Sequence, residues 1–227
     1  MRLHYFQHVE YEDLGFIYDW CAENDVQLSK TEFYKEEPIF PDLNKIDGLV
    51  VLGGSMSVRD IHQYPWMTKE MSFIQEAIKC QKKIIGICMG AQLIAKALGS
   101  TVTQNKYEEI GWHSVDGIGS NKLSTLFRTH PSPLFQWHSD TFKLPKDSIL
   151  LAKSDACSNQ AFIYNHHVLA MQFHLEFTKE IVTHLLHDEG EPPMGPFTQS
   201  SQQIIHEEYF LQAKELLNKI LTVFFKN

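Results

Sequence analysis

The stretch KIIGICMGAQ, residues 83–92, decides the fold class. Its first five residues form a largely apolar run, which is typical of a strand buried on both faces of a sheet. A helical pattern follows at residues 90–98, and Gly99 comes directly after it as a helix terminator. Cys88 therefore lies at a sharp turn from a strand into a helix, with one glycine two positions before it and another two positions after it.

A second apolar run lies upstream, at residues 47–52, and ends in the pair Gly53-Gly54. Pro65 then opens a helix, because proline is well tolerated at a first helical position, where its missing N–H has no intrahelical partner. The apolar residues of this helix recur at helical spacing, namely Met67, Met71, Ile74 and Ile78. The order strand, helix, strand, helix predicts an α/β fold with an open, mostly parallel sheet flanked by helices.

The rest of the chain extends this pattern. Further strands are expected at residues 3–6, 28–34, 110–115, 148–153, 160–164 and 168–173, and a further helix at residues 11–24. Residues 188–200 contain three prolines and two glycines and are expected to form a long loop. Ser200 and Gln203 have the spacing of a capping box at the start of a last helix, residues 201–225. We expect residues 1–227 to form a single domain.

The composition is that of an ordinary globular protein. The chain has 227 residues, 43% hydrophobic and 21% charged, with a formal net charge of −8. No run of lysine and arginine exceeds two residues, which argues against nucleic acid as a partner. No apolar run reaches the roughly 18 residues of a membrane span, and the N-terminus lacks the apolar stretch of a signal peptide. Four cysteines without a C-x-x-C pair favour a reduced, cytoplasmic protein.

The pattern G-x-C-x-G around Cys88 has the form of a nucleophile elbow, in which serine is the usual central residue. A sharp strand-to-helix turn exposes the central side chain at the carboxyl end of the sheet. The helix N-terminus behind the sulfur favours a thiolate, which is the nucleophilic form of cysteine. The alternative is a cysteine that serves only as a small buried apolar side chain.

His174 and Glu176 follow the expected strand at residues 168–173. In an extended segment they point the same way, because side chains alternate with a period of two. A carboxylate beside an imidazole holds one tautomer and stabilises the imidazolium. If His174 lies close to Cys88, the three residues form a Cys-His-Glu triad of the nucleophile, base and orienting type.

The pair Gly53-Gly54 ends a strand of the same sheet. A glycine pair at this place can turn a backbone N–H toward a neighbouring site. Together with the N–H of Met89, it could hold the oxyanion of a tetrahedral intermediate. An ordinary tight turn is the alternative interpretation.

These three motifs stand in an order that closely resembles the class I (triad) glutamine amidotransferases, whose elbow reads G-x-C-x-G-x-Q. The chain looks most like the stand-alone, GMP-synthase-like members of that family. Further segments that match the family lie at residues 109–112, 136–140 and 160–162. The resemblance covers most of the chain from about Gly48 to Phe177 and implies a flavodoxin-like arrangement of the sheet.

The resemblance also implies roles for individual residues. Cys88 matches the nucleophile that attacks the side-chain amide of glutamine, His174 the general base, and Glu176 the residue that orients the histidine. Gly54 and Met89 match the backbone donors of the oxyanion hole. The substrate contacts that the resemblance implies are Gln92, His138, Ser139 and Asp140.

The function that the resemblance implies is hydrolysis of glutamine through a γ-glutamyl thioester on Cys88, with release of ammonia. No cofactor is expected. No metal is expected either, because the pairs His166-His167 and His184/His187 lack a matching cysteine or carboxylate cluster.

Three questions stay open at this point. The sequence shows no motif of a synthetase domain, so the ammonia passes either to a separate synthetase subunit or to none. The same triad would also serve a γ-glutamyl peptidase, or the fold could belong to a non-catalytic binding or regulatory member, against which the intact triad argues. Residues 188–200 could cover the site, contact a partner or simply connect two surface elements.

Overall fold

Three short strands form the centre of the main sheet, because their residues are apolar and almost all buried. They are β3 (Gly48–Val51), β4 (Lys83–Ile87) and β10 (Val168–Met171). β4 pairs in parallel with both neighbours, so β3 and β10 lie on its two sides. The parallel pairing places the carboxyl ends of all three strands at the same edge of the sheet. The computed structural model describes residues 1–226, and Asn227 lies outside them.

The sheet continues outward from this centre on both sides. The outer strands are β1 (Arg2–Gln7), β2 (Gln27–Glu32), β6 (Asp116–Gly117), β8 (Ser148–Lys153) and β9 (Ala161–Tyr164). Within residues 1–226 the sheet has eight strands in the order β2-β1-β3-β4-β10-β9-β8-β6. The strands from β2 to β10 are parallel and the others antiparallel. This confirms the open, mostly parallel sheet, and the order of the parallel strands is the flavodoxin-like one.

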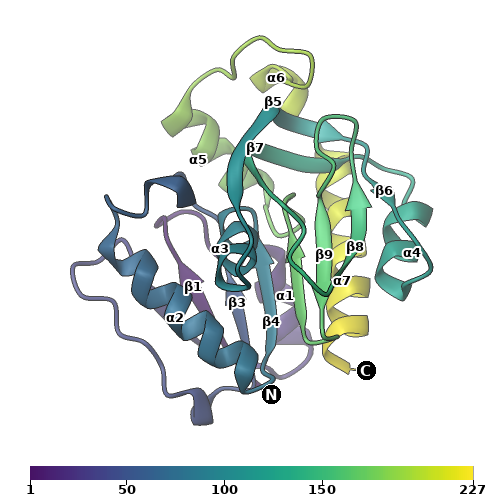
Figure 1. The fold of residues 1–227 in the computed structure, drawn as a ribbon. Helices are drawn as coiled ribbons and strands as arrows, with labels where there is room; N and C mark the ends of the chain where they lie inside the picture. The colour runs from purple at the N-terminus through teal and green to yellow at the C-terminus, as the bar shows by residue number, and fades with distance from the viewer. Residues whose placement is uncertain (227) are drawn as a thin grey trace.

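A separate pair of antiparallel strands, β5 (Val102–His113) and β7 (Leu134–Phe142), lies over the carboxyl edge of the main sheet (Figure 1). Phe135 of β7 bridges to His174, just beyond the end of β10. The sequence predicted only part of β5 and did not predict β7. The reason is that β7 carries buried polar residues, which hide the apolar alternation of a strand.

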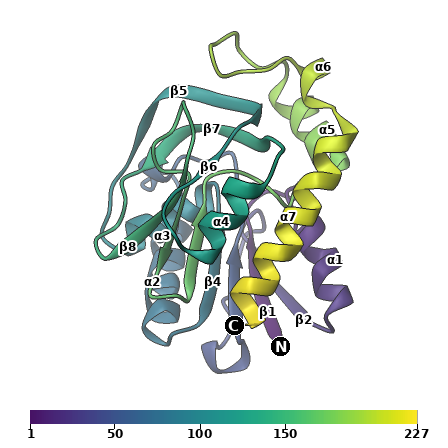
Figure 2. The ribbon, with the colours of Figure 1, turned by 90° about the vertical axis from the view of Figure 1, so that its right-hand side faces the viewer.

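Helices cover both faces of the main sheet (Figures 1 and 2). On one face lie α2 (Pro65–Lys79) and α3 (Met89–Ala97), which share an apolar cluster with the sheet. The other face has a second cluster and is covered by α1 (Phe16–Glu23), α4 (Lys122–Thr129) and α7 (Glu207–Lys226). The remaining helical segments are α5 (Lys179–Glu189), α6 (Ser201–Ile204) and two 3-10 turns, Leu43–Lys45 and Val58–Asp60.

The helix expected at residues 11–24 begins only at Phe16, and that prediction of its start was wrong. Gly15 has φ +45 and donates its N–H to the side chain of Asp13 at 2.8 Å. The N–H of Phe16 donates to the backbone oxygen of Glu176 at 2.8 Å. This long-range contact sets the start of α1, so residues 8–15 run as a loop along the carboxyl edge of the sheet.

The predicted helix over residues 201–225 is two helices, α6 and α7, and the prediction of one continuous helix was wrong. The indole N–H of Trp112 donates to the carbonyl oxygen of Ile204 at 2.7 Å, which takes the acceptor that a continuing helix would use. The capping box of Ser200 and Gln203 is present. The loop begins at Gly190 rather than at residue 188, because α5 runs through Glu189. Among the described residues, no helix combines the length and apolar composition needed to cross a membrane.

Candidate active site

Cys88 lies in a one-residue turn between β4 and α3, with φ 51 and ψ −113. A positive φ is strained for a residue with a side chain, and such strain collects at functional sites. A β-carbon on Gly90 would collide with the carbonyl oxygen of Val51, and one on Gly86 would lie 2.8 Å from the backbone oxygen of Gly90. Both glycines of the elbow are therefore needed, because the first turn of α3 lies directly against the backbone of β3 and β4.

The structure brings His174 and Glu176 to Cys88 through the pairing of β4 with β10. His174 Nδ1 donates to Glu176 Oε1 at 2.6 Å, and Glu176 Oε2 accepts the N–H of Leu175 at 3.0 Å. This arrangement leaves the other imidazole nitrogen, Nε2, for the hydrogen bond between the His174 and Cys88 side chains. The ring of Phe177 stacks on the imidazole with centroids 4.0 Å apart, which fixes the plane of the ring.

The electrostatics of His174 favour the imidazolium. Burial lowers the pKa of His174, but the charge of Glu176 and the hydrogen bond with Cys88 outweigh it and raise the pKa well above its usual value. Both His174 and Glu176 are almost fully buried. A carboxylate that is buried against one imidazole acts on it with little screening by water.

The Sγ atom of Cys88 has two further polar neighbours. It lies 3.7 Å from the carbonyl oxygen of Trp137 and 3.7 Å from the side-chain amide nitrogen of Gln172. The same Gln172 accepts a hydrogen bond from Gln92 through its Oε1, at 3.2 Å. Gln92, which the sequence assigned to the substrate site, thus also holds a residue that contacts the sulfur.

The peptide between Gly53 and Gly54 is held by a residue that the sequence analysis did not select. His8 Nδ1 donates to the carbonyl oxygen of Gly53 at 3.0 Å, and His8 Nε2 lies 3.0 Å from Glu70 Oε1, with both side chains fully buried. The peptide is trans, so the N–H of Gly54 points away from His8. This orientation fits the predicted oxyanion donor, but no local signal marks His8, whose partners lie 45 and 62 residues away.

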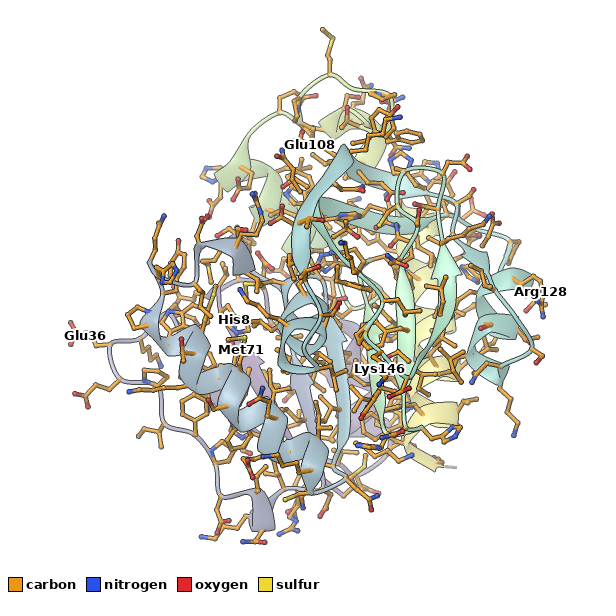
Figure 3. The ribbon with its side chains drawn as sticks, in the orientation of Figure 1. His8, Glu36, Met71, Glu108, Arg128 and Lys146 are labelled. Atoms are coloured by element: carbon orange, nitrogen blue, oxygen red, sulfur yellow. The ribbon has the colours of Figure 1, made fainter. Side chains whose placement is uncertain are left out.

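A cavity of about 300 Å³ opens on one side of Cys88 within the described part of the chain. It brings together the predicted residues that surround it, namely Gly54, Met89, Gln92, His138, Ser139 and Asp140. Glu108, labelled in Figure 3, belongs to its wall and lies on β5. The residues Glu189–Pro193 also line this cavity, so the start of the loop after α5 borders the site.

The two carboxylate oxygens of Asp140 differ in their hydrogen bonding. Its Oδ2 accepts hydrogen bonds from Ser57 Oγ at 2.6 Å and Arg59 Nε at 3.0 Å. Its Oδ1 is buried and has no hydrogen-bond partner among the described residues. One carboxylate oxygen is thus fixed by two donors, whereas the other is buried and unpartnered.

The matching segments at residues 109–112, 136–140 and 160–162 meet in one buried cluster beside the cavity. Glu109 Oε2 accepts hydrogen bonds from the Gln160 amide at 2.8 Å and Ser154 Oγ at 3.1 Å, and lies 3.3 Å from His138 Nε2. His138 Nδ1 donates to the backbone oxygen of Asp140 at 3.0 Å. The cluster therefore supports the strand that carries the predicted substrate contacts.

A second, much smaller cavity of about 30 Å³ lies on the other side of Cys88, within residues 1–226. Its lining includes Glu12, His174, Phe177 and Leu185. Glu12 comes from the loop after β1, is 4% exposed, and was not selected by the sequence analysis. The helix expected at residues 11–24 begins only at Phe16, so Glu12 lies in the loop before it.

The end of the loop after α5 is anchored to the small sheet. The N–H of Ile110 donates to the carbonyl oxygen of Phe197 at 2.9 Å, and the N–H of Gln199 donates to the carbonyl oxygen of Ile110 at 3.0 Å. The Gln199 side chain also exchanges hydrogen bonds with the backbone of Trp112. The loop thus borders the larger cavity at its start and is tied to β5 at its end.

Known proteins resemble this chain in sequence and in fold. The glutamine amidotransferase-like protein YfeJ of Salmonella typhimurium is 32% identical over 191 residues, covering 82% of this chain and 80% of that protein. A glutamine-hydrolyzing GMP synthase subunit of Thermoplasma volcanium is 34% identical over 140 residues, 59% of this chain and 64% of its own. γ-Glutamyl peptidase 3 of Arabidopsis thaliana is 30% identical over 148 residues, 62% of this chain and 59% of its own.

A solved structure of a glutamine amidotransferase from Thermotoga maritima superposes with a TM-score of 0.85 at 30% sequence identity. The match covers 100% of this chain and 99% of that one. The sequence model of the glutamine amidotransferase class-I family matches residues 19–189, which include the elbow, the β7 segment and the residues after β10. On this evidence, the chain belongs to the class-I glutamine amidotransferase family.

Proposed function

We propose that the protein hydrolyses the side-chain amide of glutamine through a γ-glutamyl thioester on Cys88 and releases ammonia. The observation that carries the proposal is the Cys88–His174–Glu176 arrangement, whose sulfur borders a cavity of about 300 Å³. We further propose that residues 1–227 act as one catalytic domain. A cytoplasmic location is part of the proposal and is supported by free cysteines throughout the described residues.

The first chemical step is attack by sulfur. Glu176 holds His174 with Nδ1–H toward the carboxylate, so Nε2 accepts the thiol proton. The raised pKa of His174 supports an imidazolium beside a thiolate. The thiolate adds to the amide carbon, and the carbonyl oxygen becomes an oxyanion.

The oxyanion is assigned to two backbone donors. Met89 is the first residue of α3, so its N–H has no partner within the helix. The N–H of Gly54, oriented by the hydrogen bond from His8 to Gly53, is the second donor. Collapse of the intermediate breaks the C–N bond as His174 gives its proton to nitrogen. Water, deprotonated by His174, then hydrolyses the thioester to glutamate.

Substrate recognition is assigned to the larger cavity. Asp140 lines this cavity, and its carboxylate is suited to attract the α-ammonium group of glutamine. Ser139 and His138 lie beside it on β7, and Gln92 on α3 donates to the backbone oxygen of Asp140 at 3.3 Å. These assignments give the γ-glutamyl part of the substrate a fixed orientation before attack.

The triad is tested by replacing the nucleophile. We expect Cys88→Ala to abolish ammonia release from glutamine, and Cys88→Ser nearly to abolish it, because a neutral hydroxyl is a much weaker nucleophile than a thiolate. Trapping with hydroxylamine should give γ-glutamyl hydroxamate with the parent protein and none with Cys88→Ala. Full glutaminase activity in Cys88→Ala would show that the triad assignment is wrong.

A second candidate function is γ-glutamyl peptidase, which is favoured by the similarity to the Arabidopsis protein of that name. It uses the same thioester but a larger amine as leaving group. Hydrolysis of γ-glutamyl peptides, without hydrolysis of free glutamine, would favour this candidate.

The similarity to the Thermoplasma GMP synthase protein supports transfer of the ammonia to a separate synthetase subunit. We expect such a partner to increase glutaminase turnover when it is added to the isolated chain.

A further inference from the structure

The two cavities that border Cys88 differ in the residues that line them. Met89 and Gln92 line only the larger cavity and His174 lines only the smaller one, whereas both cavities are lined by Gly54, Ser55, Cys88, Trp137 and Glu189. In the proposed reaction the γ-glutamyl group and its oxyanion occupy the larger cavity. The leaving nitrogen must face His174, because His174 protonates it. The smaller cavity is therefore on the side of the leaving group.

The size of the smaller cavity limits what can occupy it. Its volume is about 30 Å³, against about 300 Å³ for the larger cavity. Trp137, Phe177 and Leu185 form apolar parts of its wall. Ammonia fits this space, whereas each carbon added to the leaving amine crowds the wall further, and an amino acid would extend beyond the cavity.

Glu12 supplies a carboxyl group to this apolar space. It is 4% exposed, and none of the described residues forms a hydrogen bond with its side chain. Its Oε2 and the His174 Cε1 atom both lie 3.2 Å from the point where a β-carbon on Gly53 would stand. The Glu12 carboxyl group faces the cavity that it lines, and in this position it is able to hydrogen-bond with a molecule held beside the triad.

The titratable groups around Glu12 come from several elements. The two histidines are His174, which follows β10, and His8, which follows β1. The acidic groups are Glu176 after β10, Glu189 at the end of α5, and the Tyr11 hydroxyl in the same loop as Glu12. Burial raises the pKa of Glu12 to about 7, with the negative groups adding to this effect and the histidines opposing it. Glu12 is thus able both to give and to take a proton near neutral pH.

We propose that the smaller cavity is the leaving-group site and that Glu12 binds the departing ammonia there. The proposal rests on the glutaminase function proposed above and specifies its leaving group. It makes Glu12 a residue that contacts a reacting atom, and it favours glutamine over γ-glutamyl amides of larger amines.

The proton balance is complete within the site. When the C–N bond breaks, the electron pair leaves with nitrogen, and His174 provides the proton that completes NH₃. Glu12 in its acid form gives its proton to NH₃, which yields NH₄⁺ and a carboxylate paired with it. Ammonium then leaves, and Glu12 takes up a proton from water.

The role of Glu12 is tested by measuring how often the thioester reacts with ammonia rather than with water. The protein is given unlabelled glutamine in a solution of ¹⁵N-ammonium. When labelled ammonia enters the site and attacks the thioester, it forms ¹⁵N-labelled glutamine, whereas attack by water forms glutamate. We expect Glu12→Gln to lower labelled glutamine formed per glutamate by about tenfold, the scale of one hydrogen bond to a charged group. Glu12→Asp should restore part of the ratio. The exposed Glu10 lies on the same loop, and Glu10→Gln is the matched control.

This ratio does not depend on how much enzyme is folded. An unchanged ratio in Glu12→Gln would overturn the proposed role of Glu12. A parent protein that forms neither glutamate nor γ-glutamyl hydroxamate from glutamine would instead overturn the glutaminase function, so the two failures are distinguishable.

The size limit is tested with glutamine, γ-glutamyl methylamide and γ-glutamyl ethylamide. We expect kcat/KM of the parent protein to fall about tenfold or more for each added carbon. Leu185→Ala should raise the ethylamide-to-glutamine ratio of kcat/KM by about tenfold, because it widens the cavity. Leu186 precedes the end of the same helix without lining this cavity, so Leu186→Ala should leave the ratio unchanged. Equal kcat/KM for all three amides in the parent protein would contradict the leaving-group assignment.

Discussion

At the scale of single residues, the environment of Glu12 makes the stability of the protein depend on pH. The pKa of this carboxyl group rises from 4.5 to about 7 on folding, mainly through burial. Between these pH values the folded protein binds more protons than the unfolded chain, so this group lowers the free energy of unfolding as pH rises.

The free energy of unfolding of Glu12→Gln, relative to that of the parent protein, should therefore be higher at pH 8 than at pH 5 by up to about 3 kcal/mol. The measurement is the difference in Tm between the two proteins at each pH. The same difference at both values would refute a buried, protonated Glu12.

The elbow glycine Gly90 is a second residue with a definite expectation. A β-carbon there would meet the carbonyl oxygen of Val51, which is backbone and cannot rotate away. We expect Gly90→Ala to lower the free energy of unfolding by about 1–3 kcal/mol, as overpacking does elsewhere. Urea unfolding measures this change. Gly195→Ala, whose new methyl group would meet only the Thr198 side chain, is the control and should stay within about 0.5 kcal/mol of the parent.

At the scale of elements, His8 joins three parts of the fold. It follows β1, contacts Glu70 of α2 and donates to Gly53 after β3. His8, labelled in Figure 3, lies beside α2. The two buried partners fix the peptide whose N–H is proposed to stabilise the oxyanion.

Replacing His8 should therefore affect the chemical step more than substrate binding. We expect His8→Ala to lower kcat for glutamine about tenfold to a hundredfold with little change in KM, since one oxyanion donor is worth about 10²–10³ in rate. Steady-state kinetics measure the split. The rate of Cys88 alkylation is the control, and it should persist. An unchanged kcat would show that the His8 contact does not position Gly54.

The helices and strands also show which parts of the fold local sequence patterns predict and which they do not. β4 and β8 begin and end where their apolar runs predict, because a buried strand needs only local apolar residues. β7 escaped prediction because Gln136, His138 and Asp140 are buried polar residues. Ser57 and Arg59 hold the Asp140 side chain, and Glu109 lies beside His138, so these partners come from other segments of the chain. The elbow glycines marked Cys88 locally, whereas Glu12 carries no local signal and reaches the site through a loop whose end is set by Glu176.

At the scale of the whole molecule, the two apolar clusters share one sheet. One lies under α2 and α3, and the other lies under α1, α4 and α7. Because every central strand contributes to both clusters, neither face can lose its packing without exposing the other side of the same strands.

We therefore expect the chain to unfold as one unit. Far-ultraviolet circular dichroism and tryptophan fluorescence should report the same midpoint in urea. Trp66 lies with the first cluster and Trp20 and Trp112 lie in the second, so fluorescence samples both faces. Two separate transitions would contradict the proposed single domain.

The single free nitrogen of His174 also imposes an order of events on the proposed reaction. Nδ1 is bonded to Glu176, so ammonia and the hydrolytic water both need the position beside Nε2, and only one of them can occupy it at a time. The first product must depart before the second reactant arrives, so the acylated enzyme waits with its thioester intact. During that interval the nitrogen is free to travel to an acceptor while the carbon skeleton stays bound, which separates the two halves of glutamine in time as well as in space.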